Sequence, residues 1–521
     1  MNIIVEASTL NTFSQGVGNS LLKEICLLPA KNLSEEIARI VGQQNISTQD
    51  EALDLFKNNQ NVFQGRRPQL IAYPQNSQEI QQLVQLANEH NLALIPTSSK
   101  APKLRSDSIP NVENAIMVDL SQMDQILRVD EKNKVVMIQA GVTFHQLIDA
   151  LKTKGLRPLM PLFPPPSKSV VSSALDREPI TFPRFHWDTS DPLLCTETIF
   201  GSGDLFRTGT AAGPGTLEEQ WASGQAQKNP LGPSQFDPFR ILQGSQGTLG
   251  IVSWATIKCE KTPQIQKVFF ASSDSLNELY SFTYHVLKRR LGDHLFILNR
   301  VNFASLLRTT TAEIQTLIES LPEWILVVSI SGHGIIPQDE IEYVEKDITE
   351  IANKTSLILQ PRIGAVKGAE FLKVLDQSCP EPYWKLRFRG GCQEVFFLTT
   401  LDRTSELFAL FFEKIQSSKI DQIGVYIQPL VQGNHVHCEF DLFYNPQDAQ
   451  EISKVKEAYV EGSRVLLENG AFFSRPLGPI VNEIYEKGSP ETIAILKTVK
   501  SIFDPRGVMN PNKLCFLEGA H

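Results

Sequence analysis

The segment from about residue 266 to residue 470 repeats one pattern twice, and this repeat limits the folds that the chain can adopt. Short apolar stretches alternate with segments that have the spacing of amphipathic helices. The first run contains KVFFAS, HLFIL and ILVVSIS with helices near 275–291, 311–320 and 339–352, and the second contains EVFFLTT, GVYIQP and HVHCEFDLF with helices over 403–416 and 447–468. Two such runs are typical of a duplicated ferredoxin-like unit, with antiparallel strands backed by helices.

A second region of mixed strands and helices precedes the repeat. TFHQLIDALKTKG (143–155) predicts a helix with Thr143 as its N-cap, and residues 156–238 are so rich in Pro, Gly and Ser that they predict one long ordered loop. A capping box, TQDE (48–51), predicts a short helix within the first 60 residues. The other expected elements are a helix over 78–90 and strands over 70–74, 92–96, 116–120, 135–141 and 249–258.

Composition excludes several classes of function. The chain has 521 residues, too many for one ordinary core, so we expect two large domains. Its 49 basic and 58 acidic residues give a net charge of −9, which argues against a nucleic-acid-binding protein. Seven scattered cysteines without a CxxC pair are typical of reduced thiols in a cytoplasmic protein. No stretch approaches about 18 consecutive apolar residues, so we expect no transmembrane segment.

Three stretches stand out in this order: RPQLIAYPQNSQEIQQLVQLANEHNLALIP, GSQGTLGIVSWATIK (244–258) and FDPRGVMNPNK (503–513). They resemble the landmarks of the vanillyl-alcohol oxidase and p-cresol methylhydroxylase flavoprotein superfamily, which includes FAD-linked D-lactate, glycolate and D-2-hydroxyglutarate dehydrogenases. The resemblance implies an α+β protein with a two-lobed PCMH-type FAD-binding domain and a cap domain whose antiparallel sheet has the duplicated ferredoxin-like topology. The expected divisions are an N-terminal helical adaptor (1–60), the FAD-binding domain (61–265), the cap (266–474) and a C-terminal segment that returns to the FAD domain (475–521).

The loops that bind FAD in this superfamily are rich in glycine, but here they lack it. They read PTSSKAPKLRSD (96–107) and PPPSKSVVSSALDREP (164–179). Hydroxyls and lysines also suit phosphate, so we expect FAD to be retained. The first loop has no His or Cys at the position where the superfamily attaches its flavin, so we expect FAD to be bound non-covalently. The alternative is a catalytically silent structural subunit of a redox complex that has lost FAD. The expected cofactor-binding residues are Pro96, Thr97, Ser98, Ser99, Lys100, Ser167, Lys168, Ser169, Gly244, Gly247, Gly250, Ile251, Val252 and Asn510.

The stretch HVHCEFD (435–441) lies in the expected cap, the layer that faces the flavin in this superfamily. As a strand, it places His435, His437, Glu439 and Asp441 on one face. GNHVH (433–437) resembles the metal-binding GNxH segment of the 2-hydroxyacid branch, with one residue inserted. Three interpretations stay open: a solvated strand face, a proton-transfer site that uses His435 or His437, and a Zn or Mn site formed by His435, His437 and Glu439.

Three cations in the expected cap indicate which chemical group the substrate could carry. KLRFR (385–389), read as a strand, places Lys385, Arg387 and Arg389 on one face, where a carboxylate substrate would relieve their repulsion. A charged edge strand is the alternative. Arg475 resembles the arginine that reaches toward the flavin in the phenol-oxidising branch, where it would stabilise the reduced anion.

Together these features predict an FAD-dependent dehydrogenase or oxidase that acts on a small molecule, either a 2-hydroxy acid or an aromatic alcohol, by hydride transfer to flavin N5. The expected catalytic residues are His435, His437, Arg475 and Arg387. Electrons would pass to a partner protein or a quinone. Any iron–sulfur relay would lie on another chain, because this one has no cysteine cluster. We expect an oligomer or a subunit of a complex.

Overall fold

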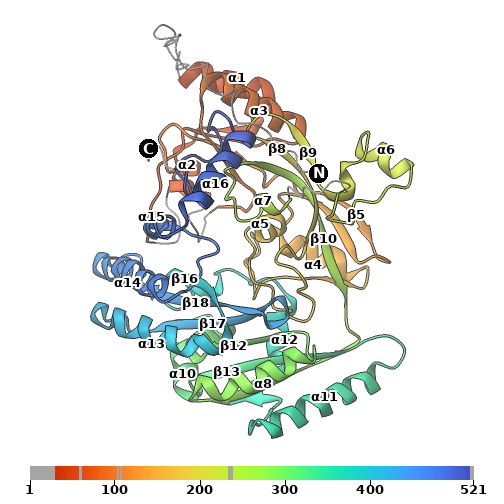
Figure 1. The fold of residues 1–521 in the computed structure, drawn as a ribbon, viewed down its shortest axis with the longest axis vertical. Helices are drawn as coiled ribbons and strands as arrows, with labels where there is room; N and C mark the ends of the chain where they lie inside the picture. Colours follow the sequence, from red (N-terminus) through yellow and green to blue (C-terminus); the bar gives the residue numbers. More distant parts are fainter. Residues whose placement is uncertain (1–29, 58–61, 102–104, 106–107, 233–238, 517–521) are drawn as a thin grey trace, which may run out of the picture.

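The computed structural model describes residues 30–57, 62–101, 105, 108–232 and 239–516. Figure 1 shows two parts, one above the other. The upper part contains the first half of the chain and its C-terminal helices, and the lower part is built around a separate sheet. Two N-terminal helices, α1 (Ala30–Val41) and α2 (Asp50–Lys57), agree with the expected helical start, whereas residues 1–29 lie outside the described part.

A four-stranded sheet forms one half of the upper part. Its order is β1-β2-β4-β3, with β2, β3 and β4 parallel and β1 antiparallel. The strands are β1 (Ile46–Ser47), β2 (Leu70–Ala72), β3 (Leu94–Thr97) and β4 (Ile116–Asp119). Helix α3 (Ser77–His90) makes the crossover that the parallel β2 and β3 require, and it starts at the N-cap Asn76, as its apolar spacing predicts. The strands and this helix confirm the predicted pattern of residues 70–120.

A six-stranded antiparallel sheet forms the other half. Its long central strand β10 pairs with β6, β7 and β8. The strands are β5 (Ile126–Asp130), β6 (Val135–Gln139), β7 (Leu156–Pro158), β8 (Leu193–Phe200), β9 (Leu205–Arg207) and β10 (Gly250–Lys261). Helix α4 (Phe144–Lys152) begins with the predicted cap, since Thr143 and Gln146 form a capping box.

Residues 156–238 do not form the single long loop that their composition predicts. They contribute three strands of the second sheet, β7, β8 and β9, and the helices α5 (Val170–Leu175) and α6 (Leu217–Ala222). A short helix, α7 (Phe239–Leu242), follows. The prediction failed because β8, LLCTETIF, lies inside a segment whose turns carry most of its Pro, Gly and Ser.

The lower part is a six-stranded antiparallel sheet with the order β11-β13-β12-β17-β18-β16. Its strands are β11 (Ile265–Ser273), β12 (Leu295–Asn299), β13 (Trp324–Gly332), β16 (Gly391–Thr399), β17 (Ile423–Leu430) and β18 (His435–Tyr444). The second half has the order strand, helix, strand, strand, helix. The first half has the same order with two further helices between its second and third strands, and the halves join where β12 pairs with β17. The duplicated ferredoxin-like topology of the cap is therefore confirmed.

Helices cover both faces of the cap sheet. On one face lie α8 (Leu276–Lys288), α11 (Pro337–Lys354), α13 (Thr404–Ile415) and α14 (Ala449–Glu468), which share one apolar core with the sheet. On the other lie α9 (Arg300–Leu307), α10 (Thr311–Ser320) and α12 (Gly368–Asp376). A small hairpin, β14 (Arg362–Ile363) and β15 (Val366–Lys367), precedes α12. Leu162 and Phe163 of the upper part pack into this second core.

The C-terminal segment returns to the upper part, as the sequence predicts. Helices α15 (Val481–Glu486) and α16 (Pro490–Phe503) lie in the upper part of Figure 1, where α16 is close to α2. The backbone N–H of Asn510 donates to the carbonyl of Leu94 in β3 at 2.8 Å, which holds this segment against the four-stranded sheet. None of the helices in the described part of the chain combines the length and apolar character needed to cross a bilayer.

Candidate active site

A cleft opens between the two sheets of the upper part. The end of β3 lines it on one side, and the start of β10 with the preceding turn lines it on the other. Seven of the residues expected to bind the cofactor meet there: Pro96, Thr97, Ser98, Gly247, Gly250, Ile251 and Val252. The structure therefore gathers segments about 150 residues apart in the sequence around one cleft.

Gly247 and Gly250 are required by close backbone packing. Gly247 has φ +71°, and a Cβ there would lie 2.4 Å from Cγ of Pro96. A Cβ on Gly250 would lie 2.5 Å from the carbonyl oxygen of Ile199. Positive φ and contacts this short exclude larger residues.

We expect Gly247→Val to reduce the amount of bound FAD strongly. The valine side chain would collide with Pro96 and project into the wall of the cleft. Flavin released by acid from the purified protein, per mole of chain, measures the effect. Gly224→Val is the matched control, because Gly224 also has positive φ but has open space around it and lies on the connection after α6. Equal flavin content in both variants would contradict the placement of FAD in this cleft.

The remaining expected cofactor residues take two positions. Ser99, Lys100, Ser167 and Lys168 line a neighbouring cavity. The other three do not line either space but contact residues that do or lie close to them. Ser169 is fully buried and donates to the carbonyl of Ala140, and Asn510 donates through Nδ2 to the carbonyl of Gln246 at 2.6 Å. Gly244 lies beside Arg177. Ser169 also caps α5, which explains why a serine stands there.

The neighbouring cavity, which we call the cap cavity, lies between residues 161–179 and the cap sheet. Its volume is about 120 Å³, and Ser108 and Ser172 belong to its lining and to that of the cleft. On the cap side it is lined by Tyr383, Trp384, Lys385, Glu394, Tyr426 and Glu439, and Arg105 reaches it from the upper part. Aromatic rings and charged groups thus converge directly beside the cleft.

Strand β18 confirms the predicted alternation of HVHCEFD but not the solvated face. His437, Glu439 and Asp441 share the face turned toward the cap cavity and are 2%, 3% and 0% exposed. Val436, Cys438 and Phe440 point into the opposite apolar core. His435 is only half-buried and lies near His186 rather than beside His437. The interpretation as a solvated face is therefore wrong for three of the four side chains.

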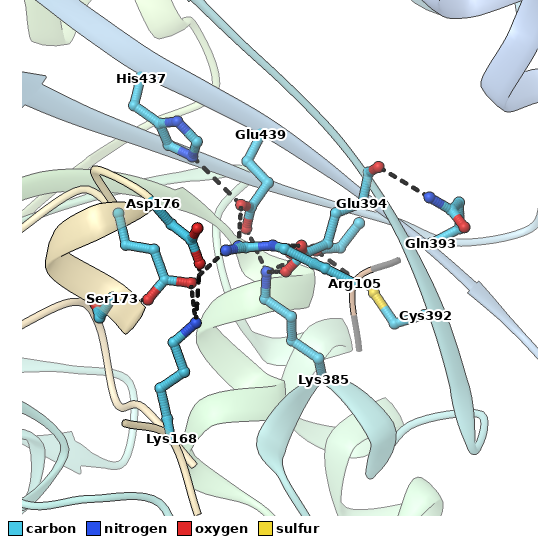
Figure 2. Close-up of polar contacts among 12 residues, drawn as sticks. Arg105, Lys168, Ser173, Asp176, Lys385, Cys392, Gln393, Glu394, His437 and Glu439 are labelled. Carbon is cyan, nitrogen blue, oxygen red and sulfur yellow. Dashed lines mark hydrogen bonds and ion pairs between the residues drawn. The ribbon is translucent and has the colours of Figure 1, made fainter. Parts of the chain in front are cut away.

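Charged side chains of both parts form a connected network at the cap cavity (Figure 2). Arg105 Nε lies 2.6 Å from Oε2 of Glu394, and the same guanidinium pairs with Glu178. Lys168 Nζ lies 3.0 Å from Glu178, and the ammonium of Lys385 contacts Glu394 and Glu439. Ion pairs therefore join the upper part to the cap sheet.

The network sets the protonation of its members. Burial favours the neutral acid, but Lys385 and His437 outweigh it and hold the pKa of Glu439 below its ordinary value. Burial raises the pKa of Asp441 to about 7, against the opposing charge of Lys385. Burial also lowers the pKa of His437, whose Nε2 lies 3.3 Å from Oε2 of Glu439. Near neutral pH, Glu439 is ionised and His437 is neutral.

The expected Zn or Mn site is not supported. His435, His437 and Glu439 do not gather as ligands, and within the described ranges the one group with metal-ligand spacing is Glu394, Glu439 and Asp441. That group already surrounds the ammonium of Lys385. The prediction failed because His435 stands at the start of the strand, on the far side of His437 from this group.

KLRFR is not a strand, which corrects a second prediction. Residues Trp384–Leu386 form a short 3₁₀ helix, η3, and the three cations diverge. Arg387 donates to the carbonyls of Leu306, Pro380 and Pro382, and Arg389 pairs with Glu451. The structure therefore gives no support to Arg387 as a substrate-binding residue.

Arg475 is a buried cation with two donors that have no partner among the described residues, as is Arg157. Arg475 is 6% exposed, its guanidinium lies 4.2 Å above the ring of Phe396, and burial, with Arg105 nearby, lowers its pKa to about 10. No described residue accepts a hydrogen bond from its Nε or Nη1. Buried donors of this kind indicate an anionic or carbonyl group as partner. With the glycine-lined cleft and the hydroxyls and lysines beside it, this arrangement fits FAD.

Sequence reasoning missed Arg105, Glu178, Glu394, Tyr383 and Tyr426. Glu394 carried a signal, since a lone acid in the apolar strand GCQEVFFLT is costly to bury unless it is paired. Arg105 and Glu178 lie in the two glycine-free loops, whose hydroxyls and lysines are the groups that the sequence predicts to bind phosphate. Nothing in the local pattern connects either residue with the cap.

Comparisons with known proteins agree with this geometry. Residues 68–208 match the family model of the FAD binding domain, and residues 480–514 match that of the FAD linked oxidases, C-terminal domain. The chain is 22% identical over 508 residues to glycolate oxidase subunit GlcD of Bacillus subtilis (strain 168), covering 93% of this chain and 97% of the relative. It is 24% identical over 492 residues to the mitochondrial D-2-hydroxyglutarate dehydrogenase of Arabidopsis thaliana, covering 91% and 80%.

Solved structures give the same fold. The structure of p-cresol methylhydroxylase with substrate bound has a TM-score of 0.79 at 15% identity and covers 94% of this chain and 97% of its own. The 4-ethylphenol oxidase from Gulosibacter chungangensis, in its isoeugenol complex, has a TM-score of 0.80 at 16% identity with the same coverage. The chain thus has the fold of p-cresol methylhydroxylase and 4-ethylphenol oxidase, and two of its segments match the FAD binding domain and the FAD linked oxidases, C-terminal domain.

Proposed function

We propose that the protein is an FAD-dependent oxidoreductase that oxidises a small alcohol held in the cap cavity. The observation that carries this proposal is the continuity of the two spaces, since Ser108 and Ser172 line both the cleft and the cap cavity. A substrate in the cap cavity would therefore lie next to a cofactor in the cleft. The names of the relatives, a glycolate oxidase subunit and a D-2-hydroxyglutarate dehydrogenase, support oxidation of an alcohol.

FAD, when bound, supplies the acceptor for the hydride that leaves the substrate carbon. The chain supplies the rest. Glu439 is an ionised carboxylate on the cavity wall, so it can accept the hydrogen bond of the substrate hydroxyl and hold the alcohol in place. His437 does not line the cavity and acts through Glu439, which it orients from 3.3 Å. Arg475 is suited to stabilising negative charge that develops on the cofactor.

The walls of the cap cavity favour an aromatic alcohol as substrate. Tyr383, Trp384 and Tyr426 line it, and burial raises the pKa of both tyrosines well above the ordinary value, so their rings stay neutral. The sequence argument for a carboxylate relied on three cations, but the protein itself engages Lys385, Arg387 and Arg389. A 2-hydroxy acid is the second candidate, supported by the names of the relatives and by Lys100, an exposed lysine at the cavity.

Anaerobic stopped-flow reduction of the flavin tests both the role of Glu439 and the substrate class. We expect benzylic and phenolic alcohols to bleach the wild-type flavin faster than glycolate or lactate. Glu439→Gln should slow this step by about a hundredfold, because the amide lacks the negative charge that binds the hydroxyl. Glu278→Gln, an exposed change at the start of α8, is the control and should behave like the wild type. Wild-type rates in Glu439→Gln would contradict this role.

The electron acceptor would be a partner protein or a quinone, because the chain itself carries no cysteine cluster for onward transfer. After reduction by the substrate, mixing with oxygen, a quinone analogue or a cytochrome would rank the acceptors. Reoxidation by oxygen as fast as by the best of the others would contradict a dehydrogenase and indicate an oxidase.

A further inference from the structure

Three carboxylates in the cap sheet are arranged as ligands for a metal ion. One oxygen each of Glu394, Glu439 and Asp441 lies within 4.8 Å of the others. The strand register brings them together, because Glu394 pairs directly with Asp441 across β16 and β18, and Glu439 stands two residues away on the same face. Like charges opposite one another across two strands destabilise a sheet, so this group needs a cation.

Two cations face the group: Arg105 pairs with Glu394 from its edge, and the ammonium of Lys385 alone lies among all three carboxylates. This ammonium contacts the carboxylates of Glu394 and Glu439 and lies 3.1 Å from Oδ1 of Asp441. Figure 2 shows Lys385 extending from η3 toward Glu394 and Glu439. An ammonium has three N–H donors, and Lys385 uses two of them in hydrogen bonds to Glu394 and Glu439.

Burial makes this cation indispensable. Lys385 is 3% exposed, and the three carboxylates are between 0% and 6% exposed. Removing one partner of a buried ion pair leaves an uncompensated charge and is strongly destabilising. The carboxylates raise the pKa of Lys385 well above its ordinary value against the opposing effect of burial, so the ammonium is permanently charged. A metal ion could neutralise the same group but could not share its space with the lysine.

We propose that Lys385 is the resident cation of the cap cavity, standing where a divalent metal would otherwise bind, and that the protein works without Zn²⁺ or Mn²⁺. The lysine holds Glu394 and Glu439 ionised at the wall of the cavity. It is thus a positioning residue. The positive charge of Lys385 is covalently part of the chain, so a chelator cannot remove it as it would remove a metal ion.

Lys385→Ala tests the proposal, because it removes the ammonium from among the three carboxylates and leaves all three carboxylates in place. Mn²⁺ is added to the variant, and the electron paramagnetic resonance signal of the free ion shows how much stays unbound. We expect the variant to bind one Mn²⁺ per chain. Wild type should bind none. Lys168→Ala is the matched control, since it removes another lysine of the same cavity that pairs instead with Asp176 and Glu178. Mn²⁺ should raise the unfolding temperature of Lys385→Ala alone.

A folded Lys385→Ala protein that binds no Mn²⁺ would overturn the proposal, and so would wild-type protein that carries one chelator-removable metal per chain. A variant that folds only when Mn²⁺ is present would support it. If the variant folds under neither condition, wild type decides, because one bound Mn²⁺ contradicts the proposal and none supports it. Metal binding is independent of the alcohol that the protein oxidises, so its outcome is separate from that of the proposed function.

Discussion

Replacing Arg475 by alanine should slow reduction of the bound flavin about a hundredfold while leaving FAD in place. The guanidinium is buried and two of its donors have no acceptor among the described residues, so it is held ready for charge that appears during the reaction. A contact of this kind acts mainly on the transition state and the product, and its loss costs about 3 kcal/mol in the barrier. Anaerobic stopped-flow spectroscopy with saturating substrate measures the rate.

Two further variants separate this role from a loss of packing. Arg475→Lys keeps the charge and should recover part of the rate, although lysine lacks the planar geometry of arginine. Arg464→Ala removes an arginine of α14 that pairs with Glu461 of the same helix and with Glu483 of α15, and it should reduce flavin at the wild-type rate. If Arg475→Ala binds FAD and reduces it at the wild-type rate, that result contradicts a role of Arg475 in flavin reduction.

Acid should destabilise the protein through His294, and His294→Asn should remove that part of the pH dependence. His294 is fully buried at the start of β12, with Nδ1 2.9 Å from Oγ1 of Thr181. Burial lowers its pKa to about 3, Arg157 acts in the same direction, and Asp293 opposes both. In the unfolded chain a histidine has a pKa of about 6.5. The unfolded state therefore binds more protons, and stability is full above pH about 6.5 and is lost as the pH falls.

From pH 7 to pH 4.5 this single histidine should cost about 2.5 kcal/mol of the free energy of unfolding. Urea denaturation at the two pH values measures the difference for each protein. In His294→Asn the difference should be smaller than in wild type by about that amount, because asparagine does not titrate. His285→Asn, on the exposed side of α8, should keep the wild-type difference. An unchanged difference in His294→Asn would show that His294 is protonated in the folded state.

The fold was largely predictable because its strands and helices differ in apolar spacing. HVHCEFD alternates over seven residues, long enough to fix both the strand and its two faces. KLRFR alternates over only five, between Pro380 and Pro382 on one side and Gly390 on the other, and such a short run between turn residues fits a 3₁₀ turn equally well. The longer pattern was therefore a sound basis for a strand and the shorter one was not.

The site was less predictable, since its chemistry depends on partners distant in the sequence. The alternation in β18 cannot reveal that Arg105 and Lys385 cover its polar face, because those residues lie 334 and 54 positions from Glu439. Two histidines and two carboxylates suggested a metal, yet the charge is balanced by a lysine of the cap itself. Neighbours of this kind come from the packing of the two parts, which no local pattern contains.

The flavin content of the purified protein tests the central claim most directly. After incubation with FAD and gel filtration, the account predicts the visible absorption bands of oxidised flavin at close to one FAD per chain, released intact by acid because the attachment is non-covalent. An aromatic alcohol added under anaerobic conditions should bleach those bands. A folded protein that stays colourless and takes up no FAD would contradict the account and would indicate a structural subunit that no longer binds the cofactor.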